Sequence, residues 1–218
     1  MTEKLSAAQV QDALPGWRVI GGKAHATFRT GTFAAGCRFL SGVTERAELA
    51  GHHPDVDLRY PFVHISLTTH DAGGLTSRDV DLARQITELA ESDDIPIDVS
   101  TPQVTEIAID AIDIPAVKPF WRAVFDYADA GDIDLVDPQG IGPTVWFQAM
   151  DEPRQQRNRI HLDVHVPHDR AEDRVAAALD AGGHLISDAD APSFWVLGDA
   201  EGNEACVCTW QGRSGTDD

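Results

Sequence analysis

Hydrophobic positions follow a helical period in three stretches near the start of the chain, residues 6–14, 33–49 and 76–90. The clearest stripe recurs at three- and four-residue spacing and consists of Phe33, Cys37, Leu40, Val43 and Ala47. Such spacing predicts an amphipathic helix whose apolar face packs on a core. Residues that favour helix ends support these bounds, because Ser6 and Thr76 precede two of the helices and Gly51 follows the third.

Between these helices the pattern changes to the two-residue period of strands. Residues 17–20 and 24–28 flank a Gly-Gly turn, and residues 56–60 alternate apolar and charged side chains. In residues 63–70, Val63, Ile65, Leu67 and Thr69 share one face, and His64, Ser66, Thr68 and His70 share the other. We therefore expect an α+β domain over residues 1–95, with helices covering one face of an antiparallel sheet.

The second half of the chain repeats one order of elements. Expected strands are 104–112, 132–136 and 144–150 in the first copy, and 158–166, 184–187, 194–197 and 205–210 in the second. Expected helices are 115–127 and 170–181. Two similar units of about 50 residues predict a duplicated domain of paired βαβββ repeats over residues 104–211. Residues 96–103 are expected to be a linker and residues 212–218 a flexible tail.

Composition limits the classes of function. The net charge of −19 repels phosphate backbones and anionic lipids, so we expect neither nucleic-acid nor membrane binding. No apolar run is long enough to cross a bilayer, and the first six residues do not resemble a secretory signal. The three cysteines form no disulfide framework. We expect a cytoplasmic globular protein.

Histidines gather in residues 48–79, with carboxylates at both ends. The residues concerned are Glu48, His52, His53, His64, His70 and Asp79. Histidine titrates near neutral pH, so this cluster suits proton transfer. Each residue also has a simpler interpretation: His52 or His53 at a helix C-terminus, His64 in a sheet hydrogen bond, and Asp79 as a helix cap. Together they favour an active site, and we rank metal-free acid–base chemistry above a metal site, because adjacent loop histidines rarely point at one ion.

Motifs within residues 5–92 resemble the pterin-4a-carbinolamine dehydratase family. They are Glu48-x-x-x-His52-His53-Pro54, Tyr60, His64 and Thr69-His70-Asp71-x-Gly73-Gly74-Leu75-Thr76-x-x-Asp79. The sequence departs from the family at Val56, where many members have an aromatic residue. The resemblance implies a lyase, a hydro-lyase that dehydrates 4a-hydroxytetrahydropterin (4a-hydroxytetrahydrobiopterin) to quinonoid dihydropterin in pterin cofactor recycling. It implies no cofactor, because no electrons are transferred.

The same resemblance implies roles for the site residues. His52 and His70 would transfer protons at the C4a hydroxyl and at N5, and which of them is the acid stays open. Glu48 and Asp79 would orient or tune the imidazoles. His53 would belong to the catalytic set as well, by holding or helping to polarise the substrate. The expected substrate-binding residues are His53, His64, Thr69 and Asp71. The implied partner is a small-molecule pterin, and the implied assembly is a homo-oligomer. The alternative is a non-catalytic dimerisation or regulatory protein, a role that this family also plays.

Residues 104–211 resemble the glyoxalase-like members of the vicinal oxygen chelate superfamily. The resemblance rests on the duplicated pattern and on residues 158–164 and 199–207. Metal-dependent members place ligands on the inner face of a cupped sheet, and the matching positions here are His161, Glu106, Gln148 and Cys206. Cys206 replaces the usual acidic ligand, so we prefer a metal-free interpretation in which His161 is partly buried and Cys206 belongs to the core. The alternative is a metal-dependent glyoxalase- or dioxygenase-like enzyme.

Overall fold

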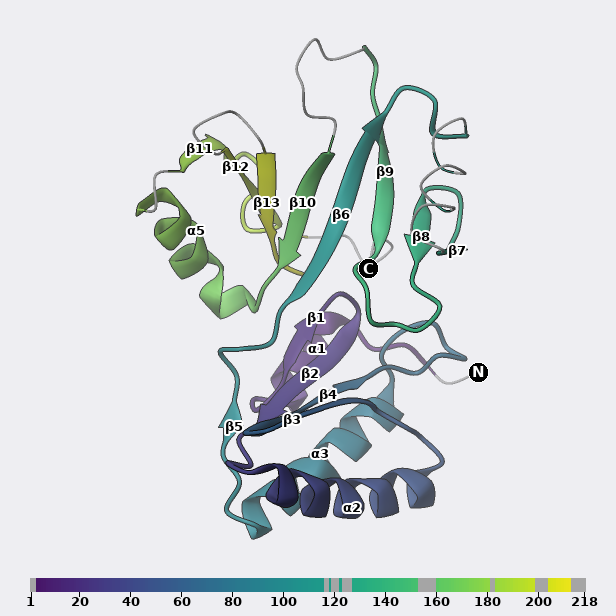
Figure 1. The fold of residues 1–218 in the computed structure, drawn as a ribbon, viewed down its shortest axis with the longest axis vertical. Coiled ribbons are helices and arrows are strands. Elements are labelled where there is room, and N and C mark those ends of the chain that lie inside the picture. Colours follow the sequence, from purple (N-terminus) through teal and green to yellow (C-terminus); the bar gives the residue numbers. More distant parts are fainter. Residues whose placement is uncertain are drawn as a thin grey trace. The chain divides into compact units, whose positions relative to one another are not determined.

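The structure is a computed structural model that describes residues 3–115, 118, 122, 127–152, 160–180, 183–198 and 204–212. It forms two compact units, one that ends at Pro102 and one over Gln103–Gly212. Each unit is built on its own sheet, of five strands in the first and eight in the second (Figure 1). Within the described residues, no helix combines the length and the apolar character needed to span a membrane.

The first unit is an antiparallel sheet with helices on one face, as expected. Its elements are α1 (Ala7–Ala13), β1 (Arg18–Ile20), β2 (Lys23–Phe28), α2 (Phe33–Ala50), β3 (Asp55–Arg59), β4 (Phe62–Leu67), α3 (Ser77–Ser92) and β5 (Ile97–Asp98). The strand order is β1-β2-β4-β3, and β5 pairs with β2. Helices α2 and α3 lie together beneath the sheet (Figure 1). The two helices and the sheet enclose a buried core that includes Phe28, Phe39 and Ile86.

The helix ends follow the capping residues in the sequence. Ser6 caps α1 through a reciprocal capping box with Gln9. Gly51 ends α2 in the left-handed conformation, with φ of 56°. Thr76 caps α3, and Asp79 closes the box by accepting from the Thr76 backbone. These local interactions satisfy the free backbone groups at the helix ends, which is why the ends can be predicted from short motifs.

The apolar stripe predicted for α2 is partly wrong. Phe33 is 50% exposed and Cys37 is exposed, whereas Gly36 and Phe39 are buried. A β-carbon at Gly36 would lie 2.5 Å from the Leu58 side chain. The helix therefore rests on the sheet at its smallest residue, and this close approach rotates Phe33 and Cys37 outward.

Two segments at the edge of this sheet have features that the sequence did not predict, namely exposed apolar side chains in one and a strand in the other. On edge strand β3, Val56 is 43% exposed, and Tyr60 just beyond it is 68% exposed. The stretch expected as a linker, 96–103, contains β5, where Asp98 pairs with Thr27 in the sheet. The Arg29 guanidinium also binds the Asp98 carboxylate. The Arg29–Asp98 ion pair and two paired positions of the sheet therefore attach the start of residues 96–103 to the first unit.

The second unit shows the expected duplication in its sheet. The first copy has β6 (Val104–Ala111), β7 (Ala128–Asp129), β8 (Asp134–Val136) and β9 (Val145–Ala149). The second has β10 (Ile160–His165), the 3-10 helix His168–Arg170, α5 (Ala171–Asp180), β11 (His184–Ser187), β12 (Phe194–Gly198) and β13 (Glu204–Cys208). In each copy the first and last strands pair in parallel, and β6 and β10 pair antiparallel between the copies. Strand β7 was not predicted.

Some predicted segments fall outside the described residues. These are most of the helix expected at 115–127, the hairpin loop 199–203 and the tail beyond Gly212. In the second copy, α5 packs on the sheet through Ala171 and Val175, which join Leu197 and Val207 in one core cluster. The helical period of residues 170–181 therefore marks a face that covers this part of the sheet.

Candidate active site

Asp79 is fully buried and binds one histidine of the cluster, His52. Its Oδ1 lies 2.8 Å from Nε2 of His52, which is itself buried. Its Oδ2 accepts from the Thr69 hydroxyl at 2.6 Å and from the Thr76 backbone N–H at 2.7 Å. One carboxylate thus caps α3, holds the loop after α2 and holds the chain end after β4. The capping and the site interpretation of Asp79 are compatible, because Oδ1 binds His52 while Oδ2 accepts both from the Thr76 backbone and from Thr69.

Arg78 connects the same two loops from the outside. Its Nη2 donates to the Gly51 carbonyl at 2.8 Å, and its Nη1 lies 3.4 Å from the Asp71 carboxylate. Sequence reasoning missed Arg78, although its place beside Asp79 at the start of α3 was visible. Arg78 and Asp79 are adjacent in α3, and each binds both the loop that carries His52 and the turn that carries His70. This loop and this turn therefore lie side by side.

His70 stands at the head of a tight turn. Thr69 and Gly74 pair across this turn, and Gly73 takes a positive φ of 62°. The His70 side chain is exposed, and within the described part of the chain it makes no hydrogen bond or ion pair. Because Thr69 is tied to Asp79, the backbone of this turn is fixed while the imidazole of His70 is left available to a ligand.

His53 and Glu48 form a second, exposed pair. His53 Nε2 lies 3.0 Å from Glu48 Oε1, and the side chains are 61% and 69% exposed. Successive residues of an extended loop point in different directions, which is why His52 turns inward to Asp79 while His53 stays at the surface. A pair this exposed contributes little to stability, so its residues are open to a role in binding.

His64 lies in a chain of hydrogen bonds on the sheet face opposite Val63 and Ile65. Its Nε2 is 3.2 Å from Nδ1 of His25, and its Nδ1 is 3.0 Å from the Thr27 hydroxyl. Nε2 of His25 is 3.2 Å from the Ile20 carbonyl, so this nitrogen must donate. Nδ1 of His25 then accepts from His64, which accepts in turn from Thr27. The expected contact of His64 with a substrate would have to replace one of these bonds. Sequence reasoning did not single out His25.

This arrangement predicts how the stability of the first unit depends on pH. Burial, then the neighbouring His64, lowers the pKa of His25 to about 3, and burial lowers the pKa of His64. The unfolded chain therefore binds more protons below pH 6.5, the ordinary histidine value. We expect stability to fall as the pH drops from about 6.5 toward 3, by up to about 1.4 kcal/mol per pH unit for His25, with a further loss in the same direction from His64.

The measurement is urea unfolding between pH 7 and pH 5, where most carboxylates stay ionised. A His25→Gln variant, which cannot titrate at this position, should show a shallower loss of stability over that range. An unchanged slope would contradict the assignment, whatever the absolute stability of the variant.

In the second unit, the structure brings together two of the four ligand positions considered. Cys206 Sγ lies 3.8 Å from His161 Nδ1, and the third neighbour is Asp163, with Oδ1 3.3 Å from the same nitrogen. Glu106 is paired with Asp163 in the sheet, but its carboxylate lies 2.9 Å from Nε2 of His165 and outside the group of three. Gln148 on β9 is exposed. The set implied by resemblance is therefore not assembled as a unit.

Comparisons with known proteins agree with this division. A family model described as pterin 4 alpha carbinolamine dehydratase matches residues 3–89, and one described as a glyoxalase-like domain matches residues 106–208. A relative from Nocardia farcinica, named "Putative pterin-4-alpha-carbinolamine dehydratase", is 49% identical over 41% of this chain and 97% of its own length. A relative of the same name from Roseiflexus is 46% identical over 41% of this chain and 99% of its own.

Among solved structures, one described as a transcriptional coactivator/pterin dehydratase from Brucella melitensis is 28% identical. It covers 40% of this chain and 99% of its own, with a TM-score of 0.38. The two curated relatives are matched over almost their whole length by the first unit. The second unit is therefore an addition that these relatives lack.

Proposed function

Because the chain belongs to the pterin-4-alpha-carbinolamine dehydratase family through its first unit and carries a glyoxalase-like second one, we propose that it dehydrates a 4a-hydroxytetrahydropterin. The reaction removes the C4a hydroxyl as water and the proton from N5, which leaves the quinonoid dihydropterin. No electrons are gained or lost, so the reaction needs only one proton donor and one proton acceptor.

Two imidazoles are available for this exchange. His52 has Nε2 held by Asp79, and its Nδ1 has no partner within the described residues and is not among the buried unpaired atoms. Nδ1 therefore reaches the surface of the site, with its ring orientation fixed from behind. His70 presents an exposed ring from the neighbouring turn. We assign proton transfer at the hydroxyl and at N5 to these two residues, with Asp79 as the group that orients His52.

The observation that supports this proposal most is the double attachment at Asp79, which joins the His52 loop to the His70 turn. Proton transfer requires both groups within hydrogen-bond reach of one ring, and a shared buried carboxylate keeps their loops adjacent. The proposed substrate is a small molecule that is flat and polar, and exposed His53 and Asp71 lie where they can border it.

The test is turnover of 4a-hydroxytetrahydropterin by the full chain, with and without a metal chelator. We expect turnover well above the spontaneous rate and no loss on chelation, because both proton-transfer groups are side chains of the first unit. Absence of turnover in a chain that still self-associates would select the non-catalytic alternative. Turnover that the chelator abolishes would contradict metal-free chemistry in the first unit.

His53 is expected to act on substrate binding more than on the chemical step. His53→Gln removes a charged or donating ring at an exposed position and should raise KM about tenfold, the equivalent of one hydrogen bond of about 1.4 kcal/mol, with a smaller change in kcat. Steady-state kinetics separates the two parameters. Glu48→Gln is the matched variant, because Glu48 is paired with His53. If His53→Gln lowers kcat more than it lowers substrate affinity, the proposed binding role of His53 is contradicted.

We extend the proposal to self-association, which the family resemblance implies. The first unit leaves β3 at the edge of its sheet, with Val56 and Tyr60 exposed beside it. Edge strands with exposed apolar side chains are favourable surfaces for pairing with another copy. In this proposal the second unit is an accessory binding or assembly module.

A further inference from the structure

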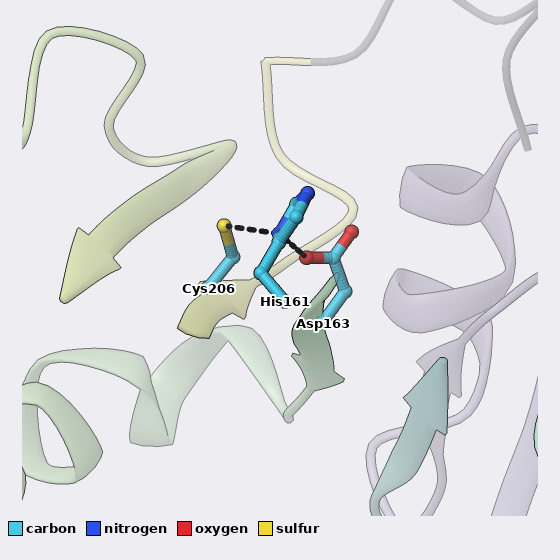
Figure 2. Close-up of side chains that lie close together, drawn as sticks. All are labelled: His161, Asp163 and Cys206. Atoms are coloured by element: carbon cyan, nitrogen blue, oxygen red, sulfur yellow. Dashed lines mark hydrogen bonds and ion pairs between the residues drawn. The ribbon is translucent and has the colours of Figure 1, made fainter. Parts of the chain in front are cut away.

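We propose that His161, Asp163 and Cys206 form a binding site for a zinc-like divalent cation on the sheet of the second unit. Figure 2 shows the three side chains converging, with His161 between the other two. His161 and Asp163 are alternate residues of β10, and Cys206 of β13 is paired with Asp163 in the sheet. All three side chains therefore leave the sheet on one face.

The distances suit a tetrahedral ion. Nδ1 of His161 lies 3.3 Å from Asp163 Oδ1 and 3.8 Å from Cys206 Sγ, and the three candidate ligand atoms lie within 4.8 Å of one another. Tetrahedral zinc with ordinary bond lengths separates neighbouring N and O ligands by roughly 3.4 Å and N and S ligands by roughly 3.6 Å.

Asp163 is a buried carboxylate whose Oδ1 has an ion-pair contact with His161 but no hydrogen bond. The residue is 7% exposed, and its Oδ1 is buried without a hydrogen-bond partner, since the nearby His161 Nδ1 is not in hydrogen-bond geometry. A buried carboxylate oxygen without a donor is costly, and native proteins pair such groups or use them to hold metals. In Figure 2 this oxygen faces His161, and the dashed line between them marks their ion pair.

The charges around the three residues favour a cation. Asp163, followed by Asp110 and Glu204, raises the pKa of His161 against the effect of burial. Burial and the same Asp163 raise the pKa of the Cys206 thiol. The same carboxylates attract a divalent ion, and binding it requires the Cys206 thiol to release its proton to solvent as the thiolate bond forms. A mixed set of imidazole, thiolate and carboxylate ligands favours Zn²⁺ over Ca²⁺ or Mg²⁺.

This site keeps His161 and Cys206 of the four positions implied by resemblance and adds Asp163 as the third ligand. Two of its ligands come from β10 and one comes from β13. The Glu106 carboxylate is instead hydrogen-bonded to His165, and Gln148 on β9 is exposed. Asp110 Oδ1 lies 3.7 Å from Nε2 of His161, on the far side of the ring, where a carboxylate can orient a metal-bound imidazole. Three protein ligands leave a fourth position for water or a small oxygen ligand.

The test uses Co²⁺ and Zn²⁺ alone as probes of the full chain after treatment with a chelator. We expect one equivalent of Co²⁺ to produce the thiolate-to-cobalt absorption of a tetrahedral site, and Zn²⁺ to displace it, since zinc binds such ligands more tightly. Cys206→Ser should abolish that absorption. Asp163→Asn should keep it but weaken Co²⁺ binding at least tenfold.

Cys37→Ser is the matched control, because Cys37 is an exposed thiol in the first unit and should not affect binding. Asp163→Asn removes a buried charge and should leave the metal-free protein at least as resistant to urea, so weaker binding would not reflect unfolding. Absorption that survives in Cys206→Ser, absorption that disappears in Cys37→Ser, or no saturable binding by the wild-type chain would each overturn the proposal. The dehydratase assay reports on the first unit, so the two proposals fail separately.

Discussion

A chain with His70 replaced by alanine is expected to remain folded and to lose dehydratase turnover by roughly 10²- to 10⁴-fold in kcat/KM, the usual contribution of one acid–base group. The reason lies in the surroundings of His70. Its ring is exposed and makes no bond within the described residues, whereas the adjacent Thr69 anchors the turn to Asp79. Removing the imidazole therefore takes away a proton-transfer group without loosening its support.

Turnover of 4a-hydroxytetrahydropterin and the urea midpoint should be measured on the same preparation. His184→Ala is the matched control, because His184 is an exposed histidine in the second unit. We expect it to leave kcat and KM unchanged. A folded His70→Ala protein with full turnover would disprove the proposed role of His70 in the dehydratase mechanism.

Asp79→Ala is expected to cause the largest loss of stability among single changes in the first unit, about 3–5 kcal/mol. The fully buried carboxylate accepts from Thr69 and from the Thr76 backbone and binds His52. Its removal leaves these buried polar groups without partners and removes the cap of α3. Turnover should also fall, because His52 loses the group that orients its ring.

Hydrogen exchange followed by mass spectrometry can measure this change in the intact chain. Peptides from residues 3–102 should lose protection, while peptides from the second unit serve as an internal reference. Asp81→Ala is the matched control on the same helix, since its carboxylate is 67% exposed and only 4.0 Å from Arg84 in an i,i+3 pair. It should change stability by less than about 0.5 kcal/mol. Equal effects of the two variants would show that Asp79 is not the centre of the network.

The α+β organisation and the duplication could be predicted because they depend on local patterns. Ser6, Gly51 and Thr76 mark helix ends through bonds to residues a few positions away. The alternation around His64 correctly separates the core face of β4 from its polar face. The rotation of α2 could not be predicted in this way, since the position of Gly36 against Leu58 depends on how closely two distant segments approach.

The candidate site shows the same limit. The motif identified His52, His70 and Asp79 as a group, but it did not reveal that Arg78 binds both loops or that His64 is engaged with His25. In the second unit, His161 and Cys206 were considered, whereas Asp163 was not, because its place beside them follows from the pairing of β10 with β13. Contacts of this kind join residues far apart in sequence, and no local spacing encodes them.

The sequence by itself determined the two-part organisation, the family of the first part and the candidates for proton transfer, because periodicity, caps and motifs are properties of neighbouring residues. The tertiary structure decided which of those side chains are buried, which share a partner and which stay free for a ligand. The physical reason is that burial and hydrogen bonding are set by strand register and by helix packing on the sheet. Only there did one carboxylate come to hold both loops, and another come to lie buried, with one oxygen that makes no hydrogen bond, beside a histidine and a cysteine.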